Sequence, residues 1–189
     1  MDSRSNLLIL GLGNLLCSDD GLGALVAQQI AGTRVVPEGV KVLDGGTLGL
    51  ALLPYLEDAD RAILVDAVAA DAAPGTLVRL DGDEVGPAVA ARLSVHQVGV
   101  SDLIEAARWR GRVPPTLVLL GAVPETTELG VGLSPRVAAS VPALLAAVCD
   151  EAGRLGYPLE LRADHDTNRA APAGLATDVF GLRPARRAD

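Results

Sequence analysis

Residues 7–23 read LLILGLGNLLCSDDGLG, and this stretch decides the fold. Its first four residues, Leu7–Leu10, are branched and apolar and end at Gly11, which is typical of a buried strand. Apolar residues then recur at helical spacing, at Leu22, Leu25, Val26 and Ile30. A strand, a glycine-rich loop and a helix in this order usually open an α/β domain.

The glycine-rich loop at first suggests a dinucleotide site, because Gly11 and Gly13 match the start of that fingerprint. However, Leu16 occupies the position of the third glycine. The helix start carries Asp19 and Asp20, and two carboxylates there would repel a pyrophosphate. The same carboxylates suit the positive end of a helix or a bound cation. We expect at least one of them to cap the helix.

Length and composition indicate one globular domain. A chain of 189 residues can bury one sizeable core, and with one Phe, one Trp and two Tyr that core must consist of Ala, Leu and Val. The net charge of −8 disfavours binding to nucleic acid or anionic lipid. No apolar run approaches the roughly 18 residues of a membrane span, and no targeting segment is apparent, so we expect a cytoplasmic protein. Cys17 and Cys149 are predicted to be free thiols.

The remaining pattern alternates strands with helices. Strands are predicted at residues 40–44, 62–68, 76–80 and 116–122, and helices at 50–56, 94–111 and 135–155. Arg79 marks 76–80 as an edge strand, and Pro142 is expected to kink or divide the last helix. The alternation predicts an α/β fold, a three-layer α/β/α sandwich with a mostly parallel twisted sheet of about five strands. We expect one domain over residues 1–160 and a poorly ordered tail over 161–189.

Five polar residues are predicted to converge at one edge of this sheet. Ligands of such folds bind beyond the carboxyl ends of the strands. Asp44 and Asp66 end strands, Asp19 and Asp20 follow the first strand, and His96 lies in the first turn of a helix. Carboxylates with an imidazole can bind zinc or nickel, and paired aspartates can act as general acid and base. Capping or surface roles explain the same spacing, so the pattern alone leaves these readings open.

The sequence also resembles the hydrogenase maturation endopeptidases. Five motifs occur in order between Leu7 and Leu155. They are Gly11-Leu12-Gly13-Asn14-Leu15 with Asp19-Asp20-Gly21, Asp44-Gly45-Gly46-Thr47, Val65-Asp66-Ala67, His96-Gln97-Val98-Gly99, and Gly132-Leu133-Ser134-Pro135. The resemblance implies an α/β/α peptidase domain. It also implies an endopeptidase that removes the C-terminal extension of a nickel-loaded hydrogenase large-subunit precursor.

The resemblance further implies roles for individual residues. Asp20, Asp66 and His96 match the metal-binding positions of the family, some members of which carry Glu where Asp20 stands. The resemblance implies that the metal is nickel already inserted in the substrate. No nucleotide cofactor is expected, because Leu16 and the two aspartates disfavour it, and the net charge of −8 disfavours a nucleic acid or membrane partner. Asp44, beside Gly45 and Gly46, is the candidate catalytic residue for positioning or general base work.

Two other functions stay open on the sequence. One is a nucleotide-binding α/β enzyme, an oxidoreductase or a transferase, which Leu16 and the two aspartates disfavour. The other is a non-catalytic nickel carrier or scaffold that uses the same three ligands. The zinc-protease pattern His-Glu-x-x-His does not occur in the sequence.

Overall fold

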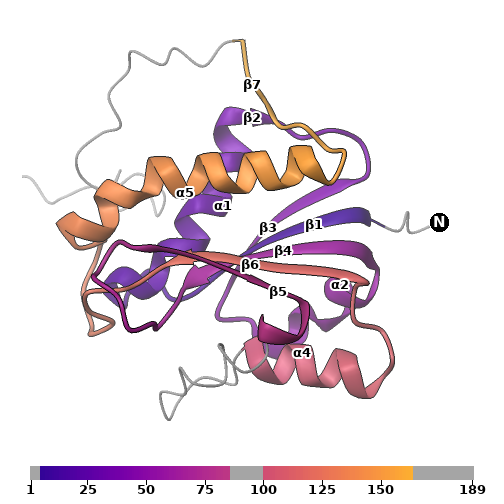
Figure 1. The fold of residues 1–189 in the computed structure, drawn as a ribbon, viewed down its shortest axis with the longest axis horizontal. Coiled ribbons are helices and arrows are strands. Elements are labelled where there is room, and N and C mark those ends of the chain that lie inside the picture. Colours follow the sequence, from indigo (N-terminus) through magenta and orange to yellow (C-terminus); the bar gives the residue numbers. More distant parts are fainter. Residues whose placement is uncertain (1–4, 86–99, 164–189) are drawn as a thin grey trace, which may run out of the picture.

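The computed structural model describes residues 5–85 and 100–163, and its centre is a five-stranded sheet (Figure 1). The strand order is β3-β1-β4-β6-β5. Neighbouring strands from β3 to β6 are parallel, and β5 runs antiparallel to β6 at the edge. The strands are β1 (Ser5–Leu12), β3 (Val40–Gly46), β4 (Ala59–Ala67), β5 (Leu77–Asp81) and β6 (Thr116–Ala122). The predicted sheet, including the edge strand that carries Arg79, is confirmed.

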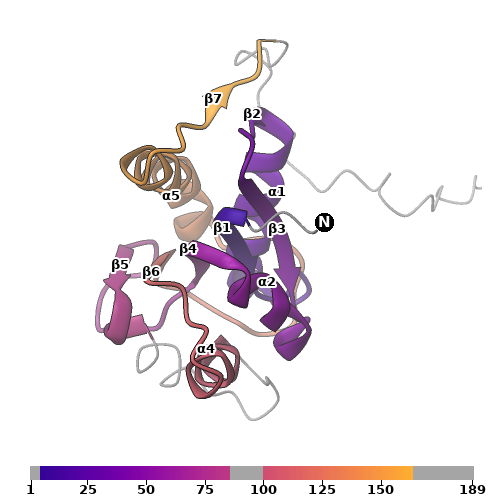
Figure 2. The ribbon, with the colours of Figure 1, turned by 90° about the vertical axis from the view of Figure 1, so that its right-hand side faces the viewer.

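Helices cover both faces of the sheet. Helices α1 and α5 lie on one face, and α2 and α4 lie on the other, as the two perpendicular views show (Figures 1 and 2). The α-helices are α1 (Leu22–Thr33), α2 (Leu53–Glu57), α4 (Val100–Trp109) and α5 (Pro135–Arg154), and short 3-10 helices are η1 (Ser18–Gly21), η2 (Gly49–Leu52) and η3 (Gly82–Glu84). The predicted three-layer α/β/α sandwich is therefore confirmed. None of the helices in the described residues is long and apolar enough to cross a membrane.

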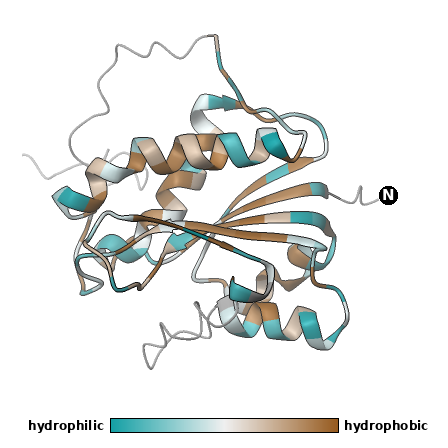
Figure 3. Ribbon diagram, in the orientation of Figure 1, coloured by the Kyte–Doolittle hydropathy of each residue, from teal (hydrophilic) through white to brown (hydrophobic). Residues whose placement is uncertain are grey.

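The core consists of two apolar layers, one on each side of the sheet. In β1, Leu7 and Ile9 pack toward α1 and α5, and Leu8 and Leu10 pack toward α2 and α4. All four side chains are fully buried. Because both faces of a parallel strand are covered, the strand is a continuous apolar run, and the central strands are correspondingly hydrophobic in Figure 3. Apolar side chains thus cover both faces of the run Leu7–Leu10, as its composition predicts.

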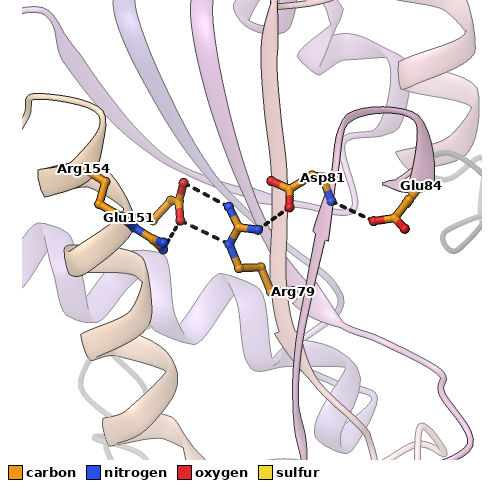
Figure 4. A network of polar contacts seen from close by, with 5 residues as sticks. All are labelled: Arg79, Asp81, Glu84, Glu151 and Arg154. Atoms are coloured by element: carbon orange, nitrogen blue, oxygen red, sulfur yellow. Dashed lines mark hydrogen bonds and ion pairs between the residues drawn. The ribbon is translucent and has the colours of Figure 1, made fainter.

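An ionic network joins the edge strand to α5 (Figure 4). Arg79 pairs with Asp81 and with Glu151, whose Oε2 lies 3.3 Å from the Arg79 Nε, and Arg154 also pairs with Glu151. The hydrogen bond to Glu151, followed by that to Asp81, raises the pKa of the Arg79 guanidinium. Glu151 is only 4% exposed. The network therefore neutralises a buried carboxylate and holds β5 against the α5 layer.

Helix α5 runs without interruption through Pro142, so Pro142 does not divide this helix, and the alternative expectation of a kink stays a prediction. A proline inside a helix costs about 3 kcal/mol or more, because one backbone hydrogen bond is lost and the ring is crowded. Val137 and Val141 before the proline, and Leu144 and Val148 after it, pack in the same apolar layer. Burial of this stripe on both sides of Pro142 offsets the local penalty.

A second, two-stranded sheet joins β2 (Arg34–Val35) and β7 (Glu160–Leu161) in antiparallel pairing. Arg162 continues this attachment, since its backbone N–H donates to the Thr33 carbonyl and its guanidinium donates to the Arg34 carbonyl. The predicted domain boundary after residue 160 thus falls inside β7. The prediction of a poorly ordered tail concerns mainly residues 164–189, which lie outside the described residues.

Candidate active site

Asp66 lies at the carboxyl end of β4, in the middle of the sheet. It pairs in register with Gly121 of β6 and is 5% exposed. Its Oδ1 accepts a hydrogen bond of 2.8 Å from the N–H of Ala67. Leu64 packs on the α2 and α4 side, so Asp66, two residues later, belongs to the same side of the sheet. The strand thus delivers a buried carboxylate to the edge at which ligands of parallel sheets bind.

Asp20 closes the loop that follows β1. It is 6% exposed, and its Oδ2 accepts a hydrogen bond of 2.7 Å from the N–H of Asn14. Gly13 has a φ of +111°, and a Cβ at this position would lie 1.7 Å from the Asp20 carbonyl oxygen. Only glycine fits this conformation and this approach. Gly13 therefore allows the backbone of Asp20 to lie close to it.

Neither aspartate caps a helix, so the expectation of a capping carboxylate is wrong. The N-cap of α1 is Gly21 and that of η1 is Cys17, and neither makes a side-chain cap bond. The reason is the one turn of η1, which places both aspartates before α1 and directs their side chains to other partners.

Close backbone packing places the loop that contains Asp20 next to the carboxyl end of β4. A Cβ on Gly11 would lie 2.1 Å from the Gly23 carbonyl oxygen, and one on Gly23 would lie 2.0 Å from the Val65 carbonyl oxygen. The start of α1 thus rests directly on β1 and β4, and η1 contacts β4. Asp20 and Asp66 consequently share one rim of the sheet.

Asp44 lies at the same rim but on the other side of the sheet. Val42 packs toward α1 and α5, and Asp44 follows it by two residues. Its Oδ2 accepts a 2.7 Å hydrogen bond from the Nε2 of Gln28 in α1, and its Oδ1 accepts one of 3.0 Å from the N–H of Gly46. Asp44 is exposed. The sequence places Asp44 and Asp66 at strand ends, and the alternation of side chains then separates them.

Asp19 has a role that the sequence analysis missed. Its side chain is fully buried and accepts hydrogen bonds from three backbone N–H groups in the segment between β6 and α5. The donors are Glu125, Thr126 and Ser134, at 2.8, 3.1 and 2.6 Å. No sequence signal points to this role, since backbone donors more than 100 residues away leave no pattern near Asp19.

The third predicted ligand, His96, lies outside the described residues, as do residues 94–99 of the helix predicted at 94–111. Among residues 5–85 and 100–163, no group of three His, Cys, Asp or Glu side chains is arranged to hold a metal ion. The described part of the site therefore provides two buried carboxylates, Asp20 and Asp66, from separate elements.

Comparison with known proteins identifies the family of this chain. The hydrogenase maturation protease family matches residues 24–151, more than half of the chain. The chain belongs to this family. The matched range includes Asp44, Asp66 and His96, and Asp20 precedes it by four residues. Hydrogenase maturation proteases cleave the C-terminal extension of the hydrogenase large subunit, so this chain is a hydrolase of the endopeptidase class.

Individual relatives agree with the family assignment. The chain is 37% identical to the hydrogenase 2 maturation protease of Escherichia coli over 164 residues, which cover 85% of this chain and 99% of the relative. It is 36% identical to the hydrogenase expression/formation protein HupD of Rhodobacter capsulatus, over 92% of this chain and 83% of the relative. The solved structure of the hydrogenase maturating endopeptidase HybD from E. coli superposes with a TM-score of 0.78 and 34% identity, over 84% of this chain and 99% of that one.

Cys149 of this maturation protease has the character of a packing residue. Burial, opposed in part by Arg34, raises the pKa of the Cys149 thiol, and Cys149 packs against the α1 and α5 layer. A thiol with a raised pKa is a poor nucleophile. The chemistry that the described rim supports is that of carboxylates, which bind a cation or move a proton.

Proposed function

We propose that this protease removes the C-terminal extension of a nickel-loaded hydrogenase large-subunit precursor, and that nickel within the substrate is the recognition signal. The observation that carries the proposal is the placement of two buried carboxylates, Asp20 and Asp66, at one rim. Burying negative charge is unfavourable unless hydrogen bonds or a cation compensate it. Asp20 accepts a hydrogen bond from Asn14 and Asp66 accepts one from Ala67, and because a carboxylate can accept several partners, a divalent cation brought by the substrate can bind beside these donors.

In this proposal Asp20, Asp66 and His96 are the protein's ligands to the substrate's nickel. Carboxylate and imidazole suit a divalent transition metal. The hydrogen bond from Asn14 to Asp20 orients that carboxylate, as partners of metal-bound carboxylates generally do. Nickel so held can polarise the scissile carbonyl or activate water.

The surface around the rim supports a polypeptide substrate. Large apolar side chains are exposed in the segments that follow the carboxyl ends of β1, β3 and β6. They are Leu15, Leu16, Leu48, Leu50, Leu129 and Val131, of which Leu129 is 92% exposed. Exposed apolar side chains gathered around a site are typical of surfaces that bind other chains. We place the reaction in the cytoplasm, where the free thiols Cys17 and Cys149 stay reduced.

Mixing the protein with precursor tests this function. Nickel-loaded precursor is expected to shorten by the mass of its extension, and nickel-free precursor is expected to stay intact. Equal cleavage of both forms would contradict recognition of nickel. Tight nickel binding by the isolated protein, with no cleavage of either form, would favour the carrier or scaffold function instead.

Asp44→Asn tests the proposed catalytic role of Asp44. If Asp44 acts as a general base, kcat falls by about 10²-fold or more, because an amide cannot accept the proton. The amide still has an oxygen for the N–H of Gly46, so the melting temperature should change little. Gln28→Ala is the matched control, since it removes the partner of Asp44 and keeps the carboxylate. Unchanged kcat in Asp44→Asn would leave Asp44 as a residue that fixes β3 to α1.

A further inference from the structure

The buried carboxylate of Asp19 has no part in the function proposed above, although it lies next to Asp20 in the chain. It is fully buried and belongs to no ion pair described in residues 5–85 and 100–163. Its charge is balanced by the N–H groups of Glu125, Thr126 and Ser134. Hydrogen bonds to a charged acceptor are the strong ones, so these three contacts fasten the β6–α5 segment firmly.

Backbone hydrogen bonds join the same two segments at Asp19 and at the residues that precede it. The N–H of Ser18 donates to the Gly130 carbonyl, and the N–H of Gly130 donates to the Leu16 carbonyl, each at 2.9 Å. The N–H of Asp19 donates to the Thr126 carbonyl at 3.2 Å. These bonds hold residues 16–19 against residues 125–134 at the rim of the sheet. Asp20 follows directly after the first of these two segments.

The backbone conformation of Ser18 indicates that the contacts between these two segments constrain the loop after β1. Its φ is +52°, which makes it the one non-glycine residue with positive φ among the described residues. Such a conformation is disfavoured for a residue with a side chain and persists where the surroundings enforce it. The contacts of Asp19 follow Ser18 immediately and precede Asp20. Their loss would let Ser18 relax and would shift the carboxylate of Asp20.

We propose that Asp19 is a positioning residue, which fixes the Asp20 carboxylate by fastening the loop after β1 to the segment between β6 and α5. The effect on cleavage rests on the proposed role of Asp20, but the effect on the loop does not. Asn14 reports the loop directly, because its N–H donates to the Asp20 Oδ2 at 2.7 Å. Release of Asp19 should therefore weaken a hydrogen bond in which Asp19 takes no part.

Asp19→Asn, studied by amide hydrogen exchange and by cleavage of nickel-loaded precursor, tests the proposal. The amide group keeps one oxygen and turns an NH₂ toward N–H donors. Exchange should accelerate at Glu125, Thr126 and Ser134 and also at Asn14. Cleavage should fall by about 10²-fold, as a misplacement of about 1 Å can cause. Faster exchange at the three donors with unchanged exchange at Asn14 would overturn the proposal, because Asp19 would then support only the distant segment.

Two variants separate positioning from general loss of stability. Glu151→Gln also removes a buried, hydrogen-bonded carboxylate, but in the α5 network, so it should lower the melting temperature and leave cleavage near the wild-type rate. Gly130→Ala keeps Asp19 and places a Cβ 2.5 Å from the Ser18 Oγ, so the Ser18 hydroxyl must turn away and lose its hydrogen bond to the Glu128 carbonyl. Exchange at Asn14 and cleavage should stay near the wild-type rates in this variant, because Asp19 keeps its three donors, and an acceleration as large as in Asp19→Asn would contradict the proposal. If Asp19→Asn does not fold, the wild-type protein decides, since one opening should release Asn14 and Ser134 together and give their amides the same protection. Clearly different protection of these two amides would contradict the proposal.

A double substitution separates this proposal from the function of Asp20. If Asp19 acts through Asp20, Asp19→Asn adds no further loss of cleavage to Asp20→Asn. Full additivity of the two losses would overturn the proposal. If Asp20→Asn itself cleaves at the wild-type rate, the ligand role of Asp20 is wrong, and the exchange of Asn14 still decides whether Asp19 holds the loop.

Discussion

His96→Ala abolishes processing of the nickel-loaded precursor and leaves the protein folded. The imidazole is the only nitrogen ligand in the proposed set, and alanine leaves its coordination position without a ligand from the protein. Because loss of even a supporting contact around a metal typically reduces affinity or activity 10- to 100-fold, loss of a ligand should reduce processing by more than about 10²-fold. The mass of the precursor after incubation measures the first effect, and the melting temperature measures the second.

His165→Ala is the matched control, because it removes the other histidine of the chain. It should process the precursor at the wild-type rate. Processing by His96→Ala at the wild-type rate would show that the ligand assignment is wrong. Loss of processing in both variants would show that the assay responds to general damage.

Asp20→Asn is expected to have a similarly large effect. The change removes the negative charge that attracts nickel, but an amide oxygen can still accept the hydrogen bond from Asn14. Processing should therefore fall by more than about 10²-fold, and the melting temperature should change little. The rate of processing, followed by the mass of the precursor at a series of precursor concentrations, measures the effect.

Asp20→Glu is the control for Asp20→Asn, because the resemblance to the family includes members with Glu at this position. It keeps the charge and should retain much of the processing rate. If Asp20→Asn processes normally, Asp20 serves only to close the loop onto Asn14, and the account of nickel recognition loses one of its ligands.

The fold could be predicted because its strands are covered on both faces. The apolar runs at Leu7–Leu10 and 62–65 have no polar side, and such runs are typical of parallel strands between two helical layers. Arg79 correctly marked an edge, since the edge strand leaves room for a charged side chain to reach Glu151. Pro142 does not divide α5, because packing on both sides of it outweighs a local propensity.

The candidate site could be predicted only in part. Strand ends are visible in sequence, so Asp44 and Asp66 could be placed at one rim, but their opposite sides follow from the pairing register. The helix start suggested capping for Asp19 and Asp20, whereas the structure uses one to close its own loop and the other to hold a distant segment. His96 stays a prediction from the sequence pattern and the family resemblance.

The central claim is that Asp20, Asp66 and His96 meet around an ion at the rim of the sheet. A crystal of the protein soaked with Cd²⁺ as a surrogate for nickel tests it most directly, because anomalous scattering locates the cation. We expect one strong anomalous peak within bonding distance of a carboxylate oxygen of Asp20, a carboxylate oxygen of Asp66 and an imidazole nitrogen of His96. A peak bound elsewhere, or an imidazole that points away from both carboxylates, would contradict it.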